Sequence, residues 1–307
     1  MRGRLFVAVC AGVIVFGVAA ASGAVGRNEV VPPAGTPDLS KMALRVTDLP
    51  AGAKVSKQGY VKTSDVAEYD RVFKEGSARI GKSRLASLES DITLSADADK
   101  AAFDFQQFRA AVSTKQGRQV LAKEFASEVG VPAKNVVVGT PVSLHVGDES
   151  LAVPVKIGTP IGSIRIVIAA HRTDRVLSVL TVAGGLNVTI TASSAAVLAK
   201  PIAQHVHDGL QPVNTALPTI AGTTQVGQTL TAAPGTWTNQ PATYVYAWQH
   251  CDATGANCVA IAGANQQTYV LQATDAGSTI RVSVTASTGV GAATATSVQT
   301  AVVVPAG

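Results

Sequence analysis

Two cysteines near the C-terminal end of the chain limit how this part of the sequence can fold. From residue 244 to residue 251, Tyr244, Tyr246 and Trp248 alternate with smaller residues, which is the period of a β-strand. A loop rich in turn-forming residues follows, and it is bracketed by Cys251 and Cys258. We therefore predict a β-hairpin whose loop is closed by a disulfide. The alternatives to a disulfide are a zinc site, which would need about four ligands, and two free thiols.

The N-terminus has the pattern of a secretory signal peptide. Arg2 and Arg4 precede an apolar run over residues 5–18, and small residues then fill positions 19–24. We expect residues 1–24 to be cleaved, with Cys10 among them, and residues 25–37 to form a linker. The alternative is an uncleaved membrane anchor, because the apolar stretch approaches the ~20 residues that span a bilayer. Either way, the protein would lie outside the cytoplasm or on the extracellular face of the envelope, where disulfides form.

Residues 38–212 combine strand-like and helical periodicities. Leu39, Met42 and Val46 are spaced as in a helix, and Pro50 and Gly52 end this turn. Asp97 stands where a further helix would begin. We expect helices over residues 98–112, 120–129 and 191–210, and strands over residues 53–62, 69–75, 80–94, 135–138, 151–157, 164–170 and 175–183.

The order of these elements favours an α+β domain with an antiparallel sheet, because the strands are grouped and do not alternate strictly with helices. In residues 80–94, Leu88 and Ile92 fall on one face of the strand, and Glu89 and Asp91 on the other. This alternation predicts a sheet with one face in solvent. In helix 120–129 we expect Val120, Leu121, Phe125 and Val129 to point inward.

The element order of residues 38–212 resembles that of secreted bacterial domains with a PsbP-like fold, which include envelope lipoproteins and sensor domains of receptor kinases. The resemblance also rests on a strand followed by a terminal helix between Arg175 and Leu210, and on the opening sequence Asp48-Leu49-Pro50-Ala51-Gly52. It carries no catalytic residue over to this chain.

Residues 213–217 form a polar joint, and residues 218–304 resemble the immunoglobulin-like repeats of bacterial secreted and surface proteins. The matching residues are Pro218-Thr219-Ile220-Ala221-Gly222-Thr223, Val226-Gly227-Gln228-Thr229-Leu230, Pro234-Gly235-Thr236-Trp237, Tyr246-Ala247-Trp248-Gln249-His250-Cys251, Tyr269, Thr274-Asp275-Ala276-Gly277 and Ile280-Arg281-Val282. Short alternating runs separated by turn residues independently predict a β-sandwich. Trp248 should lie between its two sheets.

The formal charge of +5 comes from residues 40–212, which hold 21 basic and 16 acidic side chains. A mild excess of mixed sign indicates a solvated surface and not nucleic-acid binding. The sequence contains no nucleophile elbow, phosphate loop or zinc-protease helix. We therefore expect no catalytic residue, no metal ligand, no cofactor and no enzymatic activity.

One basic cluster stands out, and Glu75 alone opposes it locally. It could face an anionic polymer of the cell envelope or another surface protein. The alternative is a solvated hairpin edge whose charges prevent aggregation. The cluster consists of Arg71, Lys74, Arg79, Lys82 and Arg84.

Three functional classes stay open for this chain. The first is a non-catalytic binding protein, in which the α+β domain takes the ligand and the immunoglobulin-like module serves as spacer or adhesion module. The second is a secreted hydrolase with a site that the sequence does not reveal, and the third is a spacer without a ligand. An apolar pocket with few polar groups would favour the first, and convergent titratable groups in a cleft the second.

Overall fold

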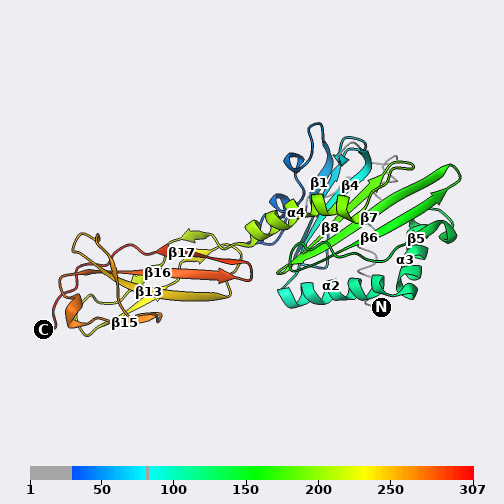
Figure 1. Cartoon of the computed structure of the whole chain (residues 1–307). Helices are drawn as coiled ribbons and strands as arrows, with labels where there is room; N and C mark the ends of the chain where they lie inside the picture. Colours follow the sequence, from blue (N-terminus) through cyan, green and yellow to red (C-terminus); the bar gives the residue numbers. More distant parts are fainter. Residues whose placement is uncertain (1–29, 81–82) are drawn as a thin grey trace. The chain divides into compact units, whose positions relative to one another are not determined.

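The computed structural model describes residues 30–80 and 83–307 (Figure 1). The predicted signal peptide, the first part of the predicted linker and Lys82 lie outside the described residues. The chain divides into two compact units between Gly209 and Leu210. The first unit is α+β, and the regular structure of the second is β-strands with one short 3₁₀ turn, η4 (Ala273–Asp275).

An antiparallel sheet forms the centre of the first unit, as the order of strands and helices predicted. Its strands follow the order β1-β2-β4-β8-β7-β6-β5, with β3 paired to β4. The strands are β1 (Val55–Val61), β2 (Ala67–Phe73), β3 (Arg79–Ile80), β4 (Ser83–Leu94), β5 (Val136–Val138), β6 (Glu149–Thr159), β7 (Gly162–Thr173) and β8 (Val176–Gly184).

Two helices, α2 (Ala98–Ser113) and α3 (Lys115–Glu128), pack on one face of this sheet. The Asp97 carboxylate accepts a hydrogen bond from the backbone N–H of Lys100, so the sequence marked the start of α2 correctly. Phe105 and Phe125 are buried in a core with β5 to β8. Val120, predicted to point inward, is 49% exposed. Leu121 and Phe125 are buried as predicted, and Val120 points away from them because adjacent helical residues point about 100° apart.

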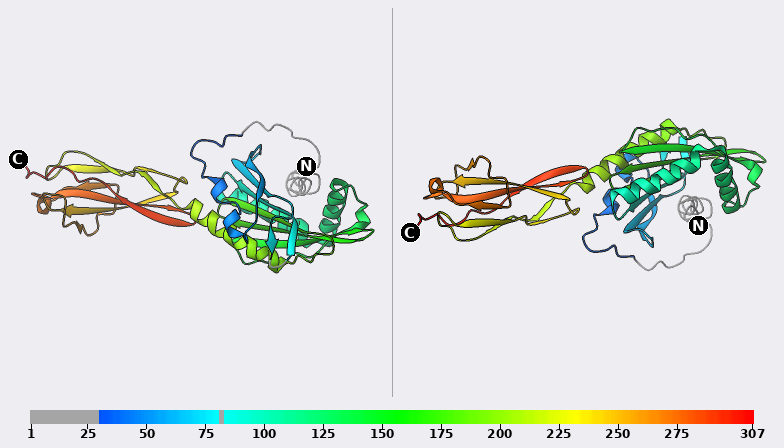
Figure 2. Two further views of the ribbon diagram at one scale, coloured as in Figure 1. Left: turned by 90° about the horizontal axis from the view of Figure 1, so that it is seen from above. Right: turned by 90° about the horizontal axis from the view of Figure 1, so that it is seen from below.

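The opposite face is covered by α4 (Ala192–Leu210) and the segment of residues 39–48, and Figure 2 shows α4 on the side of the sheet away from α3. The predicted first helix is instead two short 3₁₀ turns, η1 (Leu39–Lys41) and η2 (Val46–Asp48). Leu39 and Met42 are nonetheless fully buried. The backbone N–H of Leu44 donates to Ser90 Oγ on β4, which ties this segment to the sheet.

Strand β4 is buried on both faces, so the expected solvent face is wrong. Glu89 is 3% and Asp91 2% exposed. The reason is that Glu89 and Asp91 lie on the face of the sheet on which α2 and α3 pack. The partner of Asp91 on β8 is Val179, a member of the apolar core beneath α2 and α3.

The second unit contains three small sheets with the orders β10-β11-β15, β12-β9 and β14-β13-β16-β17. Its strands are β9 (Asn214–Ala216), β10 (Thr219–Ala221), β11 (Thr229–Ala233), β12 (Thr236–Trp237), β13 (Thr243–Cys251), β14 (Val259–Ala260), β15 (Thr268–Val270), β16 (Thr279–Thr288) and β17 (Gly291–Thr296). Trp248, Leu230 and Val282 meet in one core. The Trp248 indole donates to the carbonyl of Gln266, at 2.8 Å.

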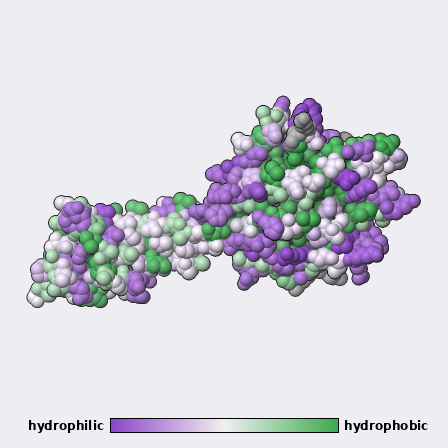
Figure 3. Space-filling view, viewed as in Figure 1, coloured by the Kyte–Doolittle hydropathy of each residue, from purple (hydrophilic) through white to green (hydrophobic). Residues whose placement is uncertain are grey.

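Two further expectations for this unit have clear outcomes. Cys251 and Cys258 form the predicted disulfide, next to the hairpin of β13 and β14. The polar joint predicted over residues 213–217 differs from the structure, because Asn214–Ala216 is a strand that pairs with β12. Pale residues of intermediate hydropathy are abundant on the visible surface of this unit in Figure 3, in keeping with its few charged side chains.

Candidate functional site

Arg71 belongs to the predicted basic surface, but the structure buries it. Its guanidinium donates to the carbonyls of Leu44 and Ser40, both at 3.0 Å, and to Gln58 Oε1 at 2.8 Å. It also lies 5.4 Å from the ring centroid of Tyr69. Arg71 therefore anchors the segment of residues 39–48 to the sheet and is not available to an external partner.

The other described members of the predicted surface, Lys74, Arg79 and Arg84, lie near the β3–β4 hairpin. Arg79 pairs with Arg84 directly across the two strands. Lys74 and Arg84 are exposed, and Arg79 is half-buried. Two like charges in directly opposite positions repel each other unless an anion lies nearby. Among the described residues, Lys74, Arg79 and Arg84 are therefore the members of the predicted cluster that remain at least partly exposed.

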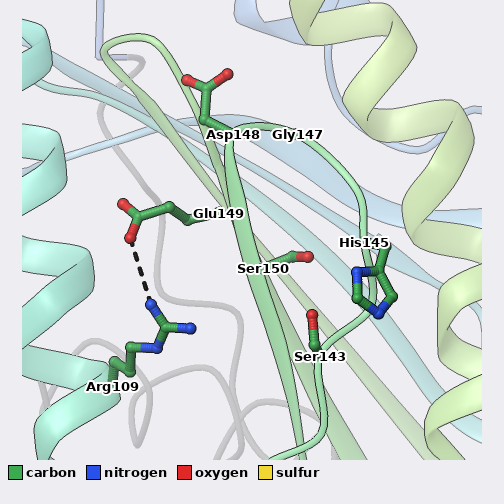
Figure 4. A pocket seen from close by; sticks show the side chains of 7 residues that line it. All are labelled: Arg109, Ser143, His145, Gly147, Asp148, Glu149 and Ser150. Atoms are coloured by element: carbon green, nitrogen blue, oxygen red, sulfur yellow. Dashed lines mark ion pairs between the residues drawn. The ribbon is translucent and has the colours of Figure 1, made fainter.

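A polar cavity of about 380 Å³ lies where α2 approaches the start of β6 (Figure 4). One wall comes from α2, and the others come from the segment of residues 143–150. We call this cavity the 143–150 pocket. Its lining residues are Arg109, Ser143, His145, Gly147, Asp148, Glu149 and Ser150.

The backbone of the segment is held to the sheet at several points. Val142 and Ala152 form an isolated antiparallel bridge, and the Val146 N–H donates to Ser150 Oγ. His145 and Gly147 have φ angles of 53° and 62°. Such a φ costs a residue with a side chain roughly 1–2 kcal/mol, and strained residues of this kind cluster at functional sites.

The charges that line the pocket are largely paired. Glu149 accepts from Arg172 at 3.0 Å and from Gln106, and it lies 3.6 Å from a guanidinium nitrogen of Arg109. Asp148 lies 3.1 Å from Arg172. The side chain of Arg109 is 50% exposed. Since a guanidinium has five N–H donors, Arg109 can still bind an anionic group.

The pocket contains serine and histidine, but it lacks the contacts of a nucleophilic catalyst. Within the described part of the chain, His145 makes no hydrogen bond to Ser143 or Ser150, and Ser150 Oγ accepts from the Val146 N–H. A nucleophile and its base normally lie within hydrogen-bonding reach of each other. The lining of the 143–150 pocket is hydrophilic. It therefore differs from the apolar pocket that would have favoured the first functional class.

A second cavity of about 440 Å³ lies on the other side of the same segment and shares Gly147 and Asp148 with the first. Lys200, Gln204 and His207 line it from α4. Thr173 also lines it, and its buried hydroxyl has no hydrogen-bond partner among the described residues. The segment of residues 143–150 therefore contributes to the walls of two cavities.

Four acidic residues share one face of strands β2 and β4, and we call this group the carboxyl face. Asp70 is paired with Asp91 across the two strands. Asp91 is buried, and its side chain interacts with that of Asp70. The carboxyl face consists of Glu68, Asp70, Glu89 and Asp91.

Burial changes the acidity of this group. It raises the pKa of Glu68 to about 7, helped by the neighbouring charge of Asp70. It also raises the pKa of Asp91 well above the ordinary value, with the charges of Glu89 and Asp70 acting in the same direction. Carboxyl groups with raised pKa values are common at functional sites.

Sequence reasoning missed both the carboxyl face and the 143–150 pocket, for different reasons. Glu89 and Asp91 were predicted on a solvated strand face, because the period of β4 does not tell which of its faces are covered. The 143–150 pocket joins Arg109 on α2 to a segment more than 30 residues away. Its one local signal was the Gly147-Asp148 pair in a short turn-like stretch before β6.

Within residues 30–80 and 83–307, no three or more His, Cys, Asp or Glu side chains are arranged to hold a metal ion. Nor does this part of the chain contain a helix that is both long and apolar enough to cross a membrane.

No protein-family model matches the chain, and no curated protein matches its sequence. Among solved structures, it is similar to the extracellular domain of PknH from Mycobacterium tuberculosis. The TM-score is 0.35 and the sequence identity 10%, and the match covers 56% of this chain and 98% of that domain.

Proposed function

We propose that this chain is a non-catalytic binding protein outside the cytoplasm, whose first unit takes a small anionic ligand in the 143–150 pocket. The leader-like N-terminus and the disulfide between Cys251 and Cys258 support this location. The observation that carries the proposal is the half-exposed guanidinium of Arg109 at the wall of a hydrophilic cavity.

The chemistry of the walls sets the class of ligand. Arg109 offers N–H donors for a carboxylate or phosphate, and the exposed side chains of Ser143 and His145 offer further polar contacts. Asp148 and Glu149 are already paired with Arg172, so they repel an anion less than free carboxylates would. A volume of about 380 Å³ lies at the small end of the range for ligand sites.

The test is binding of citrate and inorganic phosphate to the full chain, followed by NMR of backbone amides. We expect shifts confined to residues 143–150 and to α2 near Arg109, and we expect Arg109→Gln to weaken binding at least tenfold. Lys123→Gln on the exposed side of α3 is the matched control, because it removes one positive charge elsewhere. Shifts that persist unchanged in Arg109→Gln would refute the pocket.

The hydrolase alternative makes a different prediction for the same pocket. A serine nucleophile there would turn over activated esters, and Ser143→Ala or His145→Ala would abolish that turnover. We expect no turnover above buffer for the purified wild-type chain. Ester hydrolysis that is lost in either variant would overturn the non-catalytic assignment.

We propose that the second unit is an immunoglobulin-like module that spaces the first unit or contributes to adhesion. Its shared core around Trp248 and its short antiparallel strands support this assignment. Its few ionisable groups leave little material for acid–base chemistry.

A second candidate contact is the β3–β4 hairpin, where Arg79 pairs with Arg84 across the two strands. An anionic envelope polymer would relieve the repulsion between these two charges. Replacing Arg79 and Arg84 by Ser should then reduce retention on anionic cell-wall polymer at low salt, with a smaller difference at high salt. Retention equal to wild type at every salt concentration would remove this surface.

A further inference from the structure

The end of β6 opposite to the 143–150 pocket carries exposed apolar side chains. Ile161 is 78% exposed in the turn between β6 and β7, and Leu186 is 43% exposed in the loop after β8. Pro160, next to Ile161, is also exposed. We call these three residues the apolar tip. Figure 1 shows the β6–β7 hairpin projecting at the edge of the first unit.

The backbone holds the two loops of the apolar tip together. The Asn187 N–H donates to the carbonyl of Ser163 at 2.8 Å, and Asn187 Oδ1 accepts from the Ser163 N–H at 3.0 Å. A Cβ at residue 162 would collide with Asn187 Oδ1, so this close approach needs Gly162. Ile161 and Leu186 are the chain neighbours of these residues, so a fixed backbone presents both. Exposed apolar residues that gather within a polar rim mark interaction sites.

The charges around the apolar tip have one sign. The segments that form this end of the sheet contain no acidic residue, and they are residues 133–139, 154–166 and 183–190. Their basic residues are Lys134, Lys156 and Arg165, and all three are exposed. Lys156 and Arg165 pair directly across β6 and β7, so two like charges lie opposite each other. An anionic partner would relieve their repulsion.

The basic pair lies at a defined distance behind the apolar tip. Gly162 pairs with Thr159 next to the turn, and Arg165 pairs with Lys156 three residues further along the hairpin. At about 3.3 Å per residue, this pair stands roughly 10 Å behind the turn. Elements that lie in a membrane interface bury their apolar residues about 5–10 Å deep and keep basic side chains at the polar surface. The spacing in the hairpin therefore matches the depth of a lipid headgroup layer.

We propose that this end of the first unit docks on the surface of an anionic lipid bilayer. The apolar tip enters between the headgroups, and Lys156 and Arg165 bind lipid phosphates. An anionic polymer in water would match the charges but would leave Ile161 and Leu186 exposed, whereas a bilayer accommodates both features. The proposal does not depend on the 143–150 pocket, which lies at the start of β6.

The test places a tryptophan in the apolar tip of the full chain and measures its quenching by brominated lipid. Ile161→Trp is mixed with vesicles of equal parts phosphatidylcholine and phosphatidylglycerol that carry bromine on their acyl chains. Only an indole that reaches the acyl chains is quenched, and we expect quenching of the new tryptophan. The native Trp237 and Trp248 belong to the second unit and are the same in every variant.

The matched control is Phe103→Trp, because Phe103 is 58% exposed on α2, whose Arg109 lies near Glu149 at the start of β6. It should be quenched no more than the wild type, which has the same N-terminal residues.

Further substitutions in the Ile161→Trp chain separate the two contributions. Replacing Lys156 and Arg165 together by Gln should lower the affinity for these vesicles about tenfold or more, and Leu186→Ser should lower it about threefold or more. Vesicles of phosphatidylcholine alone should bind more weakly. These residues are exposed, so the fold should persist.

Equal quenching of Ile161→Trp and Phe103→Trp would overturn the proposal, because the chain would then bind vesicles without using the apolar tip. Quenching that the two Gln substitutions leave unchanged would overturn it as well. Binding to dissolved polyphosphate without quenching by the vesicles would show that this end contacts a polymer and not a bilayer. Citrate and phosphate should bind the 143–150 pocket equally in all these variants, so the failure of one proposal is distinguishable from the failure of the other.

Discussion

Glu68 and Asp91 are acidic residues whose chemistry depends on the strand that carries them. Both lie on a sheet face that adjoins an apolar core, and water cannot solvate their charges fully. The charged form is therefore disfavoured, and the pKa rises in both cases. His171 on β7 shows the converse, because burial lowers its pKa to about 4.

Glu68 should make the first unit less stable as the pH rises. Its pKa is 4.5 ordinarily and about 7 in the fold, so the folded protein holds this proton over a range in which the unfolded chain has lost it. This contribution is fully present below pH 4.5 and is lost as the pH rises to 7. Glu68→Gln should remove it and stabilise the unit at pH 8 by on the order of 1–3 kcal/mol.

Urea unfolding at several pH values, followed at 222 nm, measures this effect. Glu75→Gln is the control, because Glu75 is exposed and should leave the pH profile unchanged. The prediction is contradicted if Glu68→Gln and the wild type have the same free energy of unfolding at every pH between 4.5 and 8.

Arg71 should be a major source of stability. Arg71→Met keeps much of the side-chain volume, but it leaves the carbonyls of Leu44 and Ser40 without their donors. Unsatisfied buried acceptors cost about 1–3 kcal/mol each, so we expect a loss of roughly 2–4 kcal/mol. Arg84→Met removes an exposed charge of the same type and should change stability by less than about 0.5 kcal/mol. Equal effects in urea unfolding would show that Arg71 is not an anchor.

At the scale of elements, the segment of residues 143–150 combines fixed ends with a strained centre. The Asp148 N–H donates to the carbonyl of Arg172, and buried Leu144 and Val146 hold the segment on the sheet. These contacts offset the cost of the φ angle at His145. The segment thereby contributes to the walls of both cavities and presents polar side chains to the first of them.

Gly147 should be essential to this arrangement. Its φ is 62°, and a Cβ there would collide with the carbonyl of Arg172 and lie 2.8 Å from Thr173 Oγ1. Gly76 has a similar φ of 65° but open space around it. Gly76→Ala should cost about 1 kcal/mol for conformation alone, and Gly147→Ala should cost at least twice as much and weaken anion binding. Equal losses would show that the close approach at Gly147 is unimportant.

At the scale of the whole molecule, two units with different means of stabilisation share one chain. The first has large apolar cores on both faces of its sheet and several buried charged groups. The second has a small core around Trp248 and a disulfide. Each contains its own core, so each should fold alone.

Fragments test where the second unit begins. A fragment of residues 210–307 retains β9, in which Asn214 pairs with Trp237, and the preceding Val213, which exchanges hydrogen bonds with Thr238. A fragment of residues 218–307 lacks these contacts and should be less stable by about 1–3 kcal/mol. Tryptophan fluorescence reports on this unit, because Trp237 and Trp248 are the two tryptophans of the chain. Equal stability of the two fragments would mean that the unit begins after β9.

The sequence alone was sufficient for features that depend on neighbouring residues. The start of α2 at Asp97, the long strands β4 and β6 to β8 and the hairpin at Cys251 follow from periodicity, capping and turn-forming residues, which act within a few positions. The burial of Trp248 followed in the same way, because an aromatic residue in an alternating strand must face a core.

Only the tertiary structure decided which faces and charges are covered. Alternation placed Glu89 and Asp91 on one side of β4, but their burial depends on β8 and on the core next to it. Arg71 looked like part of a surface because its acceptor at Leu44 lies 27 residues away. The 143–150 pocket likewise needs α2 and the start of β6 together. Periodicity specifies the direction of a side chain within its own element, whereas burial and pairing depend on the elements that pack against it.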